Sequence, residues 1–189
     1  MKYVAFTTFA VLKQPYAHVD NDTFNELEPI VFGASETSPG FVARATAVDT
    51  VTTKWTNFGR DYGEWGMFAA PSFYTGGRED DTDTRASTLS VWEDLESVHA
   101  YAYSDVHLHA LRNRREWFVH LPHRLYAAWW VPEGTVPTWQ EACDRLELLN
   151  DRGPSPEAFD FIKPFTADGS PYRLRNDRNA AQSTGAVHA

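Results

Sequence analysis

The stretch SVWEDLESV, residues 90–98, joins an apolar strand to a helix, and it determines which structure we predict for the segments before and after it. Residues 86–92 have the composition of a strand, and Asp94 can cap a helix that starts at Leu95. Further along, YSDVH at 103–107 offers a second capping position in the middle of the helix. We therefore expect the helix to break at Ser104 and Asp105 and to resume to about Phe118.

The same reasoning extends in both directions along the chain. Asp22 is a plausible N-cap for an early helix, and Thr138 and Glu141 form a capping box for a late one. The expected strands are 2–12, 41–48, 86–92 and 124–131, with a further edge strand at 158–165, and the expected helices are 22–37, 95–118 and 138–150. This order predicts an α+β domain with a ferredoxin-like antiparallel sheet and helices on one face.

One domain over 1–165 accounts for most of the chain, with an insertion at about 49–85. Because the insertion alternates glycines with many aromatic residues, we expect an ordered excursion that forms a lid or wall of a pocket or crosses a partner subunit. Apolar content falls after residue 165, which predicts a flexible tail over 166–189. The strands are apolar at both parities, which favours a homodimer whose sheets face each other.

Charge and composition exclude several kinds of partner. The 189 residues carry a net charge of -9, so no basic field is available for nucleic acid or an anionic membrane. No apolar run approaches the roughly 20 residues that cross a bilayer, and residues 4–12 are better read as a strand than as a signal peptide. The single cysteine, Cys143, lies among acidic residues, which favours an inert thiol and a cytoplasmic location.

Several segments, read together, closely resemble the bacterial and fungal family known as domain of unknown function 3291. They are SPGFV (38–42), SVWEDLESV (90–98), YSDVH (103–107), RREWF (114–118), YAAWWVPEG (126–134), PTWQEACDRLELL (137–149) and GPSPEAF (153–159). The resemblance implies a dimeric α+β barrel and no particular reaction. Where the family has amide side chains this chain has Phe6, Thr8 and Val31, and Ala43 replaces a tryptophan. These exchanges predict a larger and more apolar pocket.

Tyr103 and His107 are the candidate catalytic residues, because they match the family's spacing and histidine is the usual acid or base near neutral pH. Helical periodicity alone places His99 and His109 in the buried arc and His107 beside it, unless the break at Ser104 rotates the second half. The competing interpretation is a histidine at the solvent edge, paired with Asp105 or an arginine.

The candidate ligand-binding residues combine aromatic, apolar and cationic side chains. They are Trp92, Trp129, Trp130, Phe6, Thr8, Val31 and Arg114. Trp129 and Trp130 are adjacent in a strand and must face opposite sides, so one packs and the other is available to line a cavity. The alternatives remain open: the tryptophans are core or dimer contacts, and Arg114 lies at a solvated helix end.

These observations predict no metal site, because His107 and His109 point about 200° apart on a helix, and no cofactor. We expect a mostly apolar cavity that takes a hydrophobic small molecule. Our first hypothesis is an enzyme of specialised metabolism that acts on a hydrophobic substrate, such as an aromatic or polycyclic molecule. The resemblance to the wider barrel superfamily, and no residue pattern of this chain, suggests the cofactor-independent oxygenase, cyclase or isomerase type. The alternatives are a non-catalytic dimeric ligand-binding protein and a haem-binding barrel protein.

Overall fold

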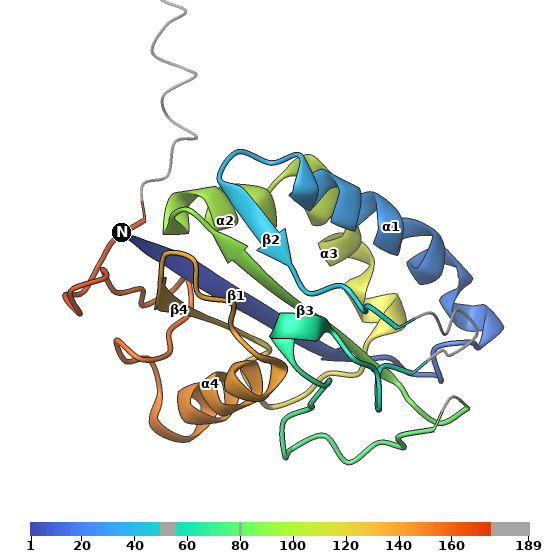
Figure 1. The fold of residues 1–189 in the computed structure, drawn as a ribbon. Coiled ribbons are helices and arrows are strands. Elements are labelled where there is room, and N and C mark those ends of the chain that lie inside the picture. Colours follow the sequence, from blue (N-terminus) through green and yellow to red (C-terminus); the bar gives the residue numbers. More distant parts are fainter. Residues whose placement is uncertain (50–55, 80, 175–189) are drawn as a thin grey trace, which may run out of the picture.

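The computed structural model describes residues 1–49, 56–79 and 81–174, apart from the side chains at 105, 106 and 111. Four strands form one antiparallel sheet in the order β2-β3-β1-β4 (Figure 1). They are β1 (Lys2–Val11), β2 (Phe41–Arg44), β3 (Arg85–Trp92) and β4 (Tyr126–Pro132). β1 lies inside the sheet, as its apolar residues at both parities require.

Four α-helices accompany the sheet: α1 (Asp22–Glu36), α2 (Leu95–Ala102), α3 (Asp105–Trp117) and α4 (Trp139–Arg152). The predicted break is confirmed, since α2 ends and α3 begins on either side of Tyr103 and Ser104. Asp94 and Thr138 accept hydrogen bonds from the first turns of α2 and α4, as predicted. Asp22 is not the N-cap of α1, because the 3-10 turn η1 (Val19–Asn21) runs directly into the helix and Asn21 occupies that position. None of the helices in the described ranges is long and apolar enough to cross a lipid bilayer.

Helices cover both faces of the sheet, so the expectation of helices on one face is wrong (Figure 1). Val4, Phe6 and Trp92 pack on the first face, the side of α1, α2 and α3. Ala5, Leu89 and Trp129 pack on the second face against Trp139 and Ala142 of α4. The apolar stripe of α4 is buried there, because the chain after β4 crosses to the opposite side of the sheet.

The segment 56–84 folds back over the second face together with α4. Its aromatic residues Tyr62, Phe68 and Tyr74 are buried, which removes from water the apolar surface that an extended excursion would expose. The short turn η2 (Gly63–Trp65) lies within this segment. Trp55 and the rest of 50–55 lie outside the described residues.

Two smaller expectations are corrected. No edge strand forms at 158–165, where the chain makes isolated bridges, one of which joins Phe159 to Ala128 of β4. Residues 166–174 are not a tail, because Tyr172 and Leu174 pack on the first face and the Tyr172 hydroxyl donates a hydrogen bond to Glu96. The part of the predicted tail beyond 174 lies outside the described residues.

Candidate functional site

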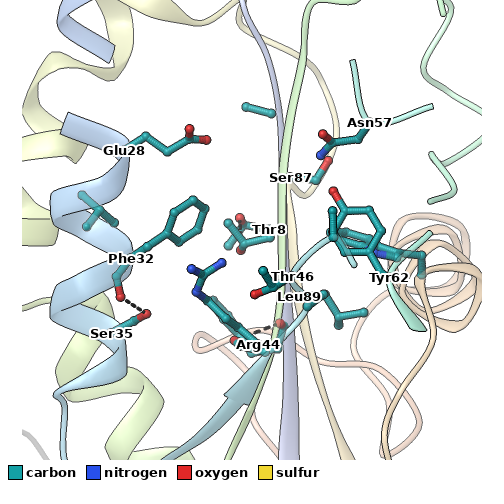
Figure 2. Close-up of a pocket in the computed structure, with 18 of the residues that line it drawn as sticks. Thr8, Glu28, Phe32, Ser35, Arg44, Thr46, Asn57, Tyr62, Ser87 and Leu89 are labelled. Atoms are coloured by element: carbon teal, nitrogen blue, oxygen red, sulfur yellow. Dashed lines mark hydrogen bonds between the residues drawn. The ribbon is translucent and has the colours of Figure 1, made fainter. Parts of the chain in front are cut away.

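A pocket of 470 Å³ lies at the edge of β3 where β2 stops (Figure 2). The last main-chain link between these strands is the hydrogen bond from the Ala45 N–H to the Leu89 carbonyl, while β3 continues back to Arg85. The uncovered part of β3 therefore forms one wall of the pocket. In Figure 2 Glu28 and Phe32 of α1 point toward the strand from one side, and Asn57 and Tyr62 lie on the other.

Five of the residues singled out in the sequence line this pocket. Phe6 and Thr8 come from β1, Val31 from α1, Trp92 from β3 and His107 from α3. Four separate elements thus bring an aromatic, aliphatic and basic set of side chains to one place.

The other predicted site residues lie elsewhere. Tyr103 is 42% exposed and its ring contacts His99 and Phe161, because it ends α2 and does not continue into α3. Trp129 is buried on the second face, and the Trp130 indole N–H donates to the Phe165 carbonyl at 2.8 Å.

Two further side chains on α3 point away from the pocket. Arg114 is exposed in the last turn of the helix, and His109 is also exposed. The helix therefore presents only His107 of its histidines to the pocket wall.

His107 is held in one protonation state by its surroundings. Its Nδ1 lies 2.8 Å from the Ala102 carbonyl oxygen, and because a carbonyl only accepts, Nδ1 carries the proton and Nε2 is the basic nitrogen. Burial lowers the pKa of His107, and the hydrogen bond to Ala102 opposes that shift only in part. The imidazole is therefore neutral near pH 7 and able to accept a proton.

An aromatic wall connects His107 to the sheet. The Tyr101 ring lies 5.2 Å from His107 and stacks 5.1 Å from Trp92, whose indole N–H donates to Ser90 at 2.9 Å. The Tyr101 hydroxyl donates to the Val31 carbonyl at 3.2 Å, and burial raises the pKa of Tyr101 to about 12. Tyr101 thus stays protonated and fixes the distance between α1 and α2.

Glu28 is an acid that sequence reasoning missed. It lines the pocket from α1 and accepts a hydrogen bond from the Tyr16 hydroxyl. Burial raises the pKa of Glu28, while the Tyr16 hydroxyl and the charges of Arg85 and Arg44 lower it by less. No local signal marked this residue, because an acidic side chain on an amphipathic helix is ordinarily solvated.

Three arginines also line the pocket, and each is paired with a carboxylate outside the lining. The pairs are Arg44 with Glu36 at 2.6 Å, Arg60 with Asp49 at 2.6 Å and Arg85 with Asp83 at 3.1 Å. Hydroxyl groups of Thr8, Thr88 and Ser90 lie on the sheet between them. Apolar surface still makes up the larger part of the lining, as expected from the sequence, and the arginines and hydroxyl groups add polar groups that the sequence did not indicate.

No three His, Cys, Asp or Glu side chains converge to form a metal site in the part of the chain that the structure describes. Cys143 is buried and free, and burial raises the pKa of its thiol to about 12. The thiol is therefore protonated near neutral pH, in line with an inert role.

The sequence profile of one family, described as domain of unknown function (DUF3291), matches residues 3–175. The chain belongs to this family. The match covers the strands, the helices and every pocket residue named above, so the pocket lies within the family domain. No curated protein and no solved structure matches the chain significantly.

Proposed function

We propose that the pocket binds a small organic molecule and that the protein is an enzyme of specialised metabolism that acts on it without a cofactor. The observation that carries this proposal is the placement of His107, neutral and with a basic Nε2, on the wall of a 470 Å³ pocket beside Tyr101 and Trp92. Pockets of this size suit ligands with one to three rings.

The chemistry that these groups support is proton transfer. A neutral histidine accepts a proton from an acidic C–H or O–H of a bound molecule, and Glu28, with its raised pKa, can return a proton elsewhere in the same pocket. Proton removal from an aromatic or polycyclic substrate is the first step of cofactor-independent oxygenation, of many cyclisations and of isomerisation. We place His107 as the base and Glu28 as the acid.

The fold supports part of what the family resemblance implies. We take the strand order β2-β3-β1-β4, with α1 and the α2–α3 pair as the crossovers, as support for a ferredoxin-like domain. The second sheet face is covered by α4 and 56–84, so a homodimer would use a different surface from the one that a two-sheet barrel closes. Cys143, free and buried, supports a cytoplasmic location.

The second candidate is a ligand-binding protein that performs no chemistry. It is favoured by the hydrogen bonds that hold Tyr101 and His107 against main-chain carbonyls, because such bonds also serve packing alone. In that case the pocket and its aromatic wall recognise the molecule and no proton moves.

The test begins with native mass spectrometry of the freshly purified protein, which reports any co-purified molecule. The second step compares His107→Phe with His109→Phe, since both residues lie on α3 and His109 is exposed. We expect His107→Phe to reduce turnover of the identified molecule about 100-fold or more while changing its affinity only a few-fold. His109→Phe should leave both unchanged.

Turnover by His107→Phe at the wild-type rate would contradict the proposed catalytic role. Absence of any chemical change by the wild-type protein, with the molecule tightly bound, would establish the ligand-binding alternative.

A further inference from the structure

We propose that Arg44 anchors an anionic group of the ligand, a carboxylate on an aromatic body, inside the pocket. The proposal rests on the proposed function to the extent that the pocket must bind a small molecule. It goes further by naming the chemical class of that molecule and the residue that selects it.

Two contacts from α1 hold the Arg44 guanidinium in place. Its Nε lies 2.6 Å from a Glu36 carboxylate oxygen, and its central carbon lies 4.4 Å above the centre of the Phe32 ring. Neither contact uses the two terminal amino groups, and no other described residue accepts a hydrogen bond from them. Figure 2 shows the guanidinium turned toward the interior of the pocket, near Phe32 and Thr46.

A fixed guanidinium with both amino groups unoccupied is suited to a carboxylate, because its parallel N–H groups match the two carboxylate oxygens. The other two arginines of the pocket are not available in this way. Arg60 directs both Nε and Nη2 to Asp49, at 3.0 and 2.6 Å, and Arg85 is only 2% exposed. The Arg44 side chain is 25% exposed, so a ligand can reach it.

The charge distribution around the pocket favours an anion in an otherwise acidic protein. The guanidinium groups of Arg44, Arg60 and Arg85 line the pocket, whereas their carboxylate partners lie behind the lining. Burial raises the pKa of Glu28, the carboxyl group that does line the pocket. The charged groups that a ligand meets first on the lining are therefore mainly guanidinium groups.

The position of Arg44 also fits the aromatic body. Arg44 lies close enough to Tyr101 for its charge to lower the pKa of that hydroxyl, and Tyr101 joins Trp92 to His107. A carboxylate on Arg44 therefore places an attached ring against the aromatic wall and next to the proposed base.

The test uses a matched pair of probes, 2-naphthoate and its neutral amide 2-naphthamide, with isothermal titration calorimetry at pH 7.5. We expect the wild-type protein to bind the carboxylate about tenfold more tightly than the amide. Arg44→Gln should abolish that preference while leaving amide binding within about twofold. Arg112→Gln, an exposed residue of α3, should behave as wild type, and circular dichroism should show all variants folded.

Arg44→Lys provides a second variant, which retains the positive charge but lacks the two parallel N–H groups of the guanidinium. It should keep only part of the preference for the carboxylate over the amide. A full preference in Arg44→Gln would overturn the role of Arg44 while leaving the pocket as a binding site. Equal affinity of the wild-type protein for both probes would overturn the anionic class. Binding of neither probe at millimolar concentration would overturn this proposal alone, because the proposed function is decided by the co-purified molecule and by the His107→Phe variant.

Discussion

At the scale of single residues, the state of His107 determines what the pocket can do. The Ala102 carbonyl fixes the proton on Nδ1, and burial disfavours a second proton on the ring. The imidazole is thus a base with a defined orientation, whereas a solvent-exposed histidine would exchange tautomers freely.

The lowered pKa of His107 makes a pH-dependent prediction. The unfolded chain binds a proton to this histidine near pH 6.5, and the folded protein binds it only at lower pH. The stability that neutral His107 confers is therefore complete above pH 6.5 and is lost as the pH falls through the folded-state pKa. We expect the imidazole resonances of His107 in NMR spectra to titrate with a midpoint below pH 6.5. The free energy of unfolding of His107→Gln should fall less between pH 7 and pH 5 than that of the wild-type protein. A midpoint at or above 6.5 would show that the ring is not desolvated.

At the level of residues, sequence reasoning pointed to pocket-lining side chains only where a family pattern or a helix break gave a signal. Family spacing singled out His107, whereas continuous helical periodicity favoured His99 and His109, and the new helix starting at Asp105 resets that periodicity. Glu28 and Arg44 gave no signal, because charged side chains on an amphipathic helix or at the end of a strand are usually solvated. Their role depends on which distant elements fold over them.

At the scale of elements, the segment 56–84 is held by one buried carboxylate. Asp83 accepts hydrogen bonds from the Thr56 hydroxyl at 2.6 Å, the Tyr74 hydroxyl at 3.0 Å and the Arg85 guanidinium at 3.1 Å. These contacts join the start of the described segment to its end and to β3. The segment therefore presents Asn57 and Tyr62 to the pocket from a fixed base.

We expect Asp83→Asn to destabilise the protein by about 3 to 5 kcal/mol, because it leaves the Arg85 guanidinium buried without a counter-charge. The matched control is Asp81→Asn, an exposed residue two positions away, which should change the free energy of unfolding by less than about 0.5 kcal/mol. Urea denaturation measures both. Equal stability of the two variants would mean that the carboxylate does not hold the segment.

The placement of α4 shows what an amphipathic pattern leaves undetermined. Its N-cap and apolar stripe were predicted correctly, and its C-terminal end to within two residues. Of the predicted capping box, the structure shows the hydrogen bond from the Glu141 N–H to the Thr138 hydroxyl, while the Glu141 carboxylate accepts from Arg145. The pattern identifies which side of a helix is buried but not the surface that covers it. The chain between Pro132 and Thr138 can lead to either face of the sheet, and so sequence reasoning placed the helices on one face.

At the scale of the whole molecule, both faces of the sheet are closed within one chain. Phe9 on the second face packs with Tyr74 and Leu146, while Val4 on the first packs with Leu95 and Val98. Strands with apolar side chains on both faces of the sheet need both faces buried. Here α4 and the segment 56–84 bury the second face. The argument for a homodimer whose sheets face each other therefore loses its physical basis, although dimerisation through another surface is compatible with this arrangement.

A chain that completes its own core should not depend on a partner to stay folded. We expect the thermal unfolding midpoint to be the same at about 1 and 100 μM protein, because a chain that folds as a monomer gains no stability from association by mass action. Differential scanning fluorimetry at both concentrations makes the measurement, and light scattering on the same samples reports the mass relative to 21.4 kDa. A midpoint that rises with concentration would show that a contact between chains contributes to the fold. The pocket would then have to be considered at the level of that assembly, because α1, which supplies Glu28, and β2, which supplies Arg44, lie at the open edge of the sheet, where a partner would also find room to bind.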